Sequence, residues 1–314
     1  MNTRIQKIIS IFCFIFIISN SLIAQLAPIK SIEGRWDITI TKGEKTMPSW
    51  LEVNHSGVKF LNGSFVGESG SARPISRINF TDDKMSFSIP PQWDNVEKDL
   101  VVEGILKDGK LSGTMNTPKG ETLSWVGVKA PKLNNTKIPV WGTPVKLFNG
   151  KNLDGWQALG AENQWIVENG VLKSPKSGAN LRTVKTFNDF KLHVEFKYPE
   201  ESNSGVYLRG RYEVQVTDSK GREPLKDQLG AVYGFIAPLE MPAKSAGEWQ
   251  SFDITLVGRV VTVALNGKTI IYKNEIPGIT GGALDSNEGE AGPIFFQGDH
   301  GPIEYRNIII TPAK

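Results

Sequence analysis

The chain has 314 residues, of which 39 % are hydrophobic and 22 % charged, as expected of a globular protein with about two domains. Its formal charge of +3 becomes +1 (34 Lys and Arg against 33 Asp and Glu) when Arg4 and Lys7 are removed with an expected leader. So small a net charge excludes an electrostatic argument for nucleic acid or an anionic membrane surface as the partner.

Residues 1–24 are predicted to be a secretory signal peptide. Arg4 and Lys7 form a basic start, residues 8–18 form an apolar run, and the segment ends at an expected cleavage site. The apolar run is too short to cross a membrane, so we expect no membrane span in the mature chain. Cys13, the only cysteine, lies inside this leader. A cysteine-free exported protein is compatible with the bacterial periplasm, which is the location we predict.

Residues 25–129 are predicted to form a small all-β domain, either a barrel or a sandwich. Short alternating runs are separated by turns rich in Gly, Asp, Asn and Pro, and no stretch has a convincing helical period. Gly34-Arg-Trp36 resembles the Gly-x-Trp start of lipocalin-like barrels. The predicted strands are 36–40, 50–53, 76–80, 84–89, 100–105 and 123–126.

A polar, proline-containing segment at 130–142 is predicted to be a linker, which places the domain boundary there. Residues 143–314 are predicted to be a second all-β domain, with Asn-Gly turns at 169–170 and 266–267. About a dozen short strands in this length indicate a two-sheet sandwich, in which one sheet often curves to form a concave face. The clearest alternating runs are 190–196, 252–257, 260–265 and 305–310.

The stretch 202–218 is predicted to be a single strand with an apolar back and a polar front. Side chains alternate between faces, with every second residue roughly 7 Å along the strand, so Arg209, Glu213 and Gln215 can line one groove. Such charged and amide side chains suit a polyhydroxy ligand. The same pattern also fits a sheet face that is merely exposed to solvent.

Four separated motifs of the second domain together resemble one family. They are 148–156 (Phe-Asn-Gly-Lys-Asn-Leu-Asp-Gly-Trp), the polar stretch 203–218, 247–253, and 292–301 followed by 305–308. In this order they look like the bacterial 3-keto-disaccharide hydrolase domain family, long catalogued as a domain of unknown function. The resemblance covers about residues 143–313 and does not extend to residues 25–130. It implies a concanavalin A-like jelly-roll β-sandwich and action on 3-keto-glycosides.

The resemblance also implies a set of site residues. They are Arg209, Glu213 and Gln215 in the polar-strand motif, and Gln297, Asp299 and His300 in the glutamine-histidine loop. The family's usual loop is Gln-Asp-His-Gly, whereas Gly298 separates Gln297 from Asp299 here. The placing of Asp299 and His300 is therefore open.

A ketone at C3 of a sugar acidifies the hydrogen on C2, so that a base can remove it and the C1 substituent can leave by elimination. Water adding to the resulting enone completes net hydrolysis. The route needs a base, an acid and donors for the enolate. His300 and Glu213 are the predicted base and acid, in an order that stays open, because both titrate near neutrality in suitable surroundings. Arg209 is predicted to bind the oxyanion or a hydroxyl, and Gln215, Gln297 and Asp299 are the other predicted substrate-binding residues.

Simpler interpretations fit some of these residues. His300 also fits a solvated loop histidine, and Glu213 an ion pair with Arg209 or Arg211. We predict no metal site, because calcium-loop and twin-histidine zinc motifs are absent, although a divalent ion on Glu213, Asp218 or His300 is left open. Glu213 and Asp218 lie on opposite parity, which argues against hydrolysis by a carboxylate pair.

Two functions follow from these observations. The first is an exported enzyme that hydrolyses 3-keto-glycosides, or eliminates and hydrates them. The alternative is a non-catalytic carbohydrate-binding protein. The charged strand and the histidine loop favour the enzyme, because lectin faces depend more on aromatic residues and neutral amides. In either case we predict a carbohydrate partner and no cofactor.

Overall fold

The computed structural model describes residues 31–91, 95–133, 138–160 and 162–314. Residues 32–314 form one compact unit. Every regular element in the described part of the chain is a β-strand, and no helix suited to crossing a membrane occurs there. The predicted all-β class is therefore confirmed, whereas the predicted signal peptide lies outside the described residues.

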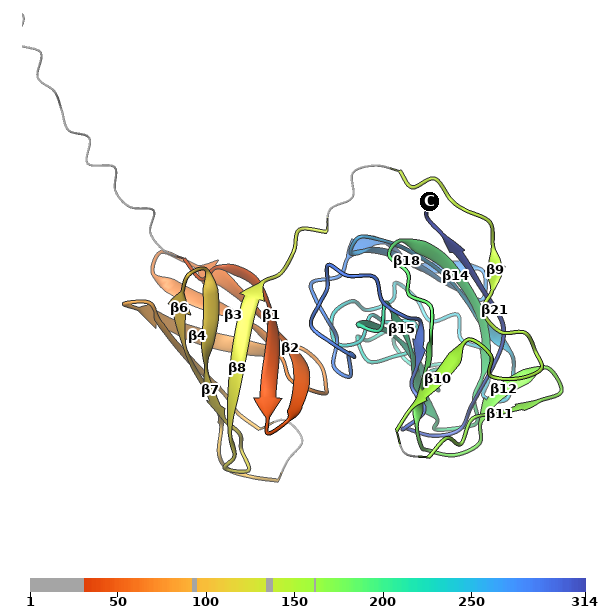
Figure 1. The fold of residues 1–314 in the computed structure, drawn as a ribbon, viewed down its shortest axis with the longest axis horizontal. Coiled ribbons are helices and arrows are strands. Elements are labelled where there is room, and N and C mark those ends of the chain that lie inside the picture. The colour runs from red at the N-terminus through yellow and green to blue at the C-terminus, as the bar shows by residue number, and fades with distance from the viewer. Residues whose placement is uncertain (1–30, 92–94, 134–137, 161) are drawn as a thin grey trace, which may run out of the picture. The chain divides into compact units, whose positions relative to one another are not determined.

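The first eight strands close into an antiparallel barrel (Figure 1). They are β1 (Gly34–Lys42), β2 (Lys45–Ser56), β3 (Phe60–Val66), β4 (Arg73–Thr81), β5 (Lys84–Ile89), β6 (Leu100–Lys107), β7 (Lys110–Asn116) and β8 (Thr122–Lys129). Strand β8 pairs with β7 and also with β1, which leaves no open sheet edge. Alternate side chains, including Trp36 and Trp125, fill the interior. Of the two predicted architectures for this region, the barrel is confirmed.

The sequence did not predict strands β3 and β7, and each contains a glycine at a close approach between neighbouring strands. A Cβ atom at Gly63 would lie 1.9 Å from the carbonyl oxygen of Glu52, and one at Gly113 would lie 1.9 Å from that of Glu103. Only glycine fits these positions. A glycine inside a strand interrupts the alternation by which strands are predicted.

The remaining strands form a two-sheet sandwich, as the predicted concanavalin A-like architecture requires. One sheet has five strands, in the order β10 (Trp156–Leu159), β13 (Asn180–Thr183), β20 (Phe295–Phe296), β15 (Asn203–Leu208) and β16 (Tyr212–Thr217). The other has eight: β11 (Ile166–Glu168), β12 (Val171–Ser174), β21 (Ile303–Pro312), β14 (Phe190–Lys197), β17 (Gln250–Val257), β18 (Val260–Leu265), β19 (Lys268–Glu275), and β9 (Val145–Lys146) beside β21. Figure 1 shows β14, β18 and β21 curving together. The separability of barrel and sandwich at residues 130–142 stays a prediction.

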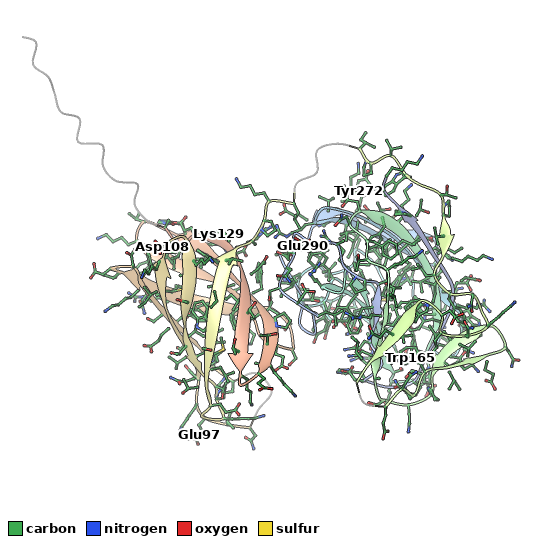
Figure 2. The ribbon with its side chains drawn as sticks, in the orientation of Figure 1. Glu97, Asp108, Lys129, Trp165, Tyr272 and Glu290 are labelled. Carbon is green, nitrogen blue, oxygen red and sulfur yellow. The ribbon has the colours of Figure 1, made fainter. Side chains whose placement is uncertain are left out.

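Aromatic side chains fill the space between the two sheets. Phe296 stacks on Tyr305 with ring centroids 4.0 Å apart, and Trp156 stacks on Phe296 at 5.1 Å. Trp165, labelled in Figure 2, donates from Nε1 to the carbonyl oxygen of Ala179 at 2.7 Å. Because one face of the five-stranded sheet is used for this core, its opposite face is the one available for polar side chains.

The two predicted Asn-Gly turns are confirmed. Asn169 and Gly170 have φ angles of 51° and 77°, and Asn266 and Gly267 have 52° and 80°. Two successive positive φ values reverse the chain in the sense that matches strand twist, and asparagine and glycine tolerate them best. These turns join β11 to β12 and β18 to β19.

The predicted single strand through 206–217 is wrong, because a turn at 209–211 divides it into the hairpin β15–β16. Arg209 and Gly210 have φ angles of 52° and 66°, and Arg211 N donates to the carbonyl oxygen of Leu208 at 3.0 Å. Because the loop has three residues, odd-numbered residues of both strands lie on one face of the hairpin and even-numbered residues on the other. The alternation therefore assigned the faces of both strands correctly and misplaced only the turn residues.

Candidate active site

Glu213 lies on the outer face of the hairpin, directly opposite Tyr207 of β15. Its carboxyl group occupies the space beside Gly205, where a Cβ atom would come within 2.4 Å of Oε1. A side chain at position 205 would therefore displace this carboxyl group. The Asn-Ser-Gly start of β15 thus has a local purpose, which is to leave room for Glu213.

The carboxyl group of Glu213 is buried, with 4 % of the residue exposed. Burial raises its pKa to about 8, while the Tyr207 hydroxyl and His300 act to lower it and Asp299 acts to raise it. Tyr207 Oη lies 2.9 Å from Glu213 Oε2 and 3.0 Å from the carbonyl oxygen of Gly281. At neutral pH the carboxyl is therefore largely protonated. It can then donate to Tyr207 Oη, which in turn donates to Gly281.

Asp299 and His300 form a hydrogen-bonded pair in the loop between β20 and β21. His300 Nδ1 and Asp299 Oδ1 are 2.6 Å apart, and both side chains are about half exposed. The hydrogen bond to Asp299 raises the pKa of His300, and Asp299 in turn has a lowered pKa because of His300. Glu213 also contributes to the raised pKa of His300. The fold thus brings Glu213, Asp299 and His300 within electrostatic range, although eighty-five residues or more separate Glu213 from the pair.

The extra residue in this loop, Gly298, has a packing role. A Cβ atom there would lie 2.3 Å from the carbonyl oxygen of Ala179, and Gly298 N donates to Asn180 Oδ1 at 2.7 Å. Asn180 Nδ2 also lies 3.5 Å from Asp299 Oδ2. The insertion therefore ties the loop to strand β13 while Asp299 and His300 remain within electrostatic range of Glu213. Asn180 was not predicted as a site residue, because nothing near it in sequence connects it to the loop.

Gln297 and Gln215 remain candidates for binding substrate hydroxyls. Gln297 is anchored to β15, with its N donating to the carbonyl oxygen of Gly205 at 3.0 Å, and its Oε1 is buried without a partner among the described residues. Gln215 shares the face of Glu213, but its Oε1 accepts from Val216 N at 3.1 Å. A ligand would have to replace that contact at Gln215.

The structure does not bring Arg209 to this site. Its guanidinium is buried and donates from Nη2 to Tyr212 Oη at 3.1 Å and to the carbonyl oxygen of Gly258 at 2.6 Å. Tyr212 precedes Glu213 in the strand and so faces the opposite side of the sheet. The predicted groove of Arg209, Glu213 and Gln215 is therefore wrong for Arg209, whose turn position carries it to the core side. Arg209 and Glu213 are both buried.

Two tyrosines complete the surroundings of Glu213. Tyr207 is fully buried, and burial together with Glu213 raises its pKa well above the usual value. Tyr233 N donates to the carbonyl oxygen of Glu213 at 3.1 Å, and burial followed by Glu213 raises the pKa of its phenol. The alternation of the sequence placed Tyr207 on the same face as Glu213. Tyr233 lies in a loop without periodicity, so nothing in the sequence indicated that it lies near Glu213. In the part of the chain that the structure describes, no three His, Cys, Asp or Glu residues are placed to hold a metal ion.

Comparison with known proteins gives a consistent result. Residues 143–311, more than half of the chain, match the model of a family described as a 3-keto-alpha-glucoside-1,2-lyase-like domain. A 3-keto-disaccharide hydrolase of Bacteroides thetaiotaomicron is 23 % identical over 184 residues, covering 46 % of this chain and 63 % of that protein. The chain thus matches less than two thirds of that relative's length.

Among solved structures, two candidate glycosyl hydrolases from Parabacteroides distasonis are similar to this chain. One is 28 % identical with a TM-score of 0.46, covering 56 % of this chain and 92 % of the other. The second is 26 % identical with a TM-score of 0.43, covering 54 % and 98 %.

Proposed function

Because the chain belongs to the family of 3-keto-alpha-glucoside-1,2-lyase-like domains, we propose that it is an enzyme that cleaves 3-keto-glycosides. The observation that carries this proposal is the buried Glu213, whose pKa of about 8 keeps it protonated near the exposed Asp299–His300 pair. The name of the Bacteroides relative, 3-keto-disaccharide hydrolase, supports the substrate class. The leader expected at residues 1–24 supports export, and we propose the periplasm as the location.

The proposed reaction starts with removal of the proton on C2, which is acidic because the ketone is on C3. The electron pair of the C2–H bond forms the enolate and then the C1=C2 double bond, while the bond from C1 to the leaving oxygen breaks. The leaving oxygen takes a proton from the acid. Addition of water, with its oxygen to C1 and its proton to C2, completes net hydrolysis.

Glu213 is the acid in this proposal. A carboxylic acid that burial keeps protonated at neutral pH has a proton to give, and a pKa near the working pH makes the transfer efficient. The Tyr207 hydroxyl contacts the carboxyl group, and its own hydrogen bond to the carbonyl oxygen of Gly281 leaves it able to accept from the protonated carboxyl. An acid for the leaving oxygen must also be desolvated together with the substrate, which fits its burial.

His300 is the base. Its Nδ1 is engaged with Asp299, which leaves Nε2 as the nitrogen that can accept the C2 proton. The carboxylate of Asp299 fixes the tautomer and stabilises the imidazolium that forms, as the third member of a catalytic triad does. Half-exposure lets the imidazolium return its proton to water after each turnover.

These roles predict a bell-shaped dependence of kcat/KM on pH. Activity requires unprotonated His300, so the rate rises with pH through a pKa that Asp299 has raised above its ordinary value. Activity also requires protonated Glu213, so the rate falls as the pH rises through about 8. An optimum between these two pKa values is expected in steady-state assays. A rate that keeps rising well beyond pH 9 would contradict the role of Glu213.

The competing function is carbohydrate binding without catalysis. The test incubates the full chain with a 3-keto-glucoside and with the matching unoxidised glucoside, and follows sugar release from each. We expect release from the keto substrate alone, and a loss of roughly 10²-fold or more in His300→Ala, as for other general bases. Equal release from both glucosides would contradict the mechanism. Calorimetric binding of the keto substrate without any release would favour the binding protein.

A further inference from the structure

The barrel contacts the sandwich through residues 67–72, the turn between β3 and β4, and this turn touches a loop that lines the candidate site. The carbonyl oxygen of Glu68 accepts from Gly282 N at 3.0 Å. A Cβ atom at Gly281 would lie 2.4 Å from the carbonyl oxygen of Gly70 and 2.7 Å from its nitrogen. The two backbones are therefore packed so closely that only glycine is accommodated at position 281.

A second sandwich loop rests on the barrel in the same way. A Cβ atom at Gly234 would lie 2.7 Å from Cβ of Ser71, at a backbone φ of 73°. The neighbouring Phe235 packs edge-on against Trp50 of β2, with ring centroids 5.3 Å apart. Trp50 is fully buried, so no solvent lies between it and the sandwich at this contact, which is part of a continuous core.

Both loops hold Glu213 directly. The carbonyl oxygen of Gly281 accepts from Tyr207 Oη, the hydroxyl that contacts the Glu213 carboxyl group. Thr280 Oγ1 accepts from Glu213 N at 3.0 Å, and Tyr233 N donates to the carbonyl oxygen of Glu213 at 3.1 Å. The backbone and the carboxyl group of Glu213 are thus both fixed by loops that pack against the barrel.

We propose that the barrel turn 67–72 is a positioning element for the acid Glu213, which it keeps desolvated and oriented by bracing the loop at 279–282. This turn lies outside the residues that match the family, so the barrel supplies part of the site that the sandwich does not supply alone. The proposal rests on the proposed function for its catalytic consequence. Its structural content, the protection of Glu213 from water, can be measured without any substrate.

Two full-length variants test the proposal from opposite sides of the contact. Gly281→Ala introduces a Cβ atom that collides with Gly70, and deletion of Ser69 and Gly70 shortens the turn itself. The matched control is Gly113→Ala, which creates a comparable backbone clash inside the barrel, against Glu103. Calorimetry establishes that each variant is folded. Carbon-13 NMR of glutamate-labelled protein follows the titration of Glu213, assigned by its absence from Glu213→Gln.

In Gly281→Ala and in the Ser69–Gly70 deletion we expect water to reach Glu213, so that its titration midpoint falls from about 8 by roughly 1 pH unit or more. On a 3-keto-glucoside, kcat should then fall more than KM changes, and the alkaline limb of the profile should move to lower pH. Gly113→Ala should lower the Tm and leave the Glu213 midpoint unchanged. If both of these variants are folded and Glu213 titrates in them as in the unmodified chain, the proposal is overturned. Absence of turnover in the unmodified chain would instead refute the proposed function, and the titration would still decide the positioning role.

Discussion

Two neighbouring residues of strand β16, Tyr212 and Glu213, belong to two different buried acid clusters. Glu213 faces outward with Tyr207, and burial raises its pKa to about 8. Tyr212 faces the core side, where its hydroxyl donates to Glu288 Oε1 at 2.8 Å. In that second cluster burial, with Glu288 close by, raises the pKa of Asp37 to about 9. By pKa alone, Asp37 would be the stronger candidate for a functional acid.

The two clusters differ in how deeply their partner groups are buried. Glu288 is completely buried and paired with Arg259, and its pKa is lowered because hydrogen bonds from Arg259, Asp37 and Tyr212 outweigh the effect of burial. The second cluster is deeply buried, with 4 % or less of Asp37, Tyr212, Arg259 and Glu288 exposed. Glu213 has a half-exposed titrating partner in His300, whose side chain is 50 % exposed. A shifted pKa therefore identifies a buried carboxyl group, and the access of a second titrating group to solvent identifies a candidate catalytic one.

The largest expected effect is on Glu213→Gln, which keeps the shape of the side chain and removes its transferable proton. We expect kcat on a 3-keto-glucoside to fall roughly 10²–10⁴-fold. The stability of the variant should be equal or higher at alkaline pH. The folded pKa of Glu213, about 8, lies above the ordinary value of 4.5, so the unmodified protein loses stability as the pH rises from about 4.5 through about 8. The amide does not titrate, so at pH 8 the variant should unfold at an equal or higher temperature. An active variant, or one that unfolds earlier at pH 8, would contradict this assignment.

The matching change in the other cluster is Glu288→Gln, for which we expect the reverse outcome. Arg259 would remain buried without its anionic partner, and breaking a buried ion pair in this way costs roughly 3–5 kcal/mol. Denaturant titration should therefore show a large loss of stability. The activity of the protein that remains folded should stay close to that of the unmodified chain. A stable Glu288→Gln protein with little activity would instead place this cluster in the catalytic machinery.

Much of the fold was predictable because it depends on local patterns. Alternation located most strands of the barrel and most of the longer strands of the sandwich, and two Asn-Gly pairs located their hairpins. Strands β3 and β7 were missed because Gly63 and Gly113 serve close contacts with neighbouring strands, which a single sequence does not reveal. The same limit applies to Gly205 and Gly281.

For the site, the resemblance to a family located Glu213 and the His300 loop. Parity placed Tyr207 on the same face as Glu213, but only the turn at 209–211, which the sequence did not predict, brings the two side by side. Arg209 was misplaced because alternation cannot distinguish a strand from a hairpin with a three-residue turn of the same parity. The contribution of the barrel could not be predicted, since the contacts of Glu68 and Gly70 with residues 281–282 join segments more than two hundred residues apart.

A smaller effect is expected for Asp299→Asn, which tests the link between the exposed pair and Glu213. Loss of the carboxylate lowers the pKa of His300 toward its ordinary value, so the acidic limb of the activity profile should move to lower pH. Asp299 also helps to raise the pKa of Glu213, so the alkaline limb should move in the same direction. The whole bell should therefore shift to lower pH, with a maximum reduced by roughly 10-fold because the base is weaker. A profile in which only one limb moves would show that the two groups are not coupled.

The smallest effect on activity is expected for Arg209→Lys, because the guanidinium lies on the Tyr212 side of the sheet. A lysine can reach one of the two acceptors, Tyr212 Oη or the carbonyl oxygen of Gly258, but cannot reproduce the planar donor that serves both. Losing one hydrogen bond from a charged group should reduce stability by about 1.5–3 kcal/mol, measured by denaturant titration. At a temperature where the variant is fully folded, kcat and KM should stay within about twofold of the unmodified chain, since no transition-state contact is lost. A large drop in kcat with unchanged stability would return Arg209 to the oxyanion role that its parity first suggested. It would also mean that the two faces of β16 are less independent than Tyr212 and Glu213 indicate.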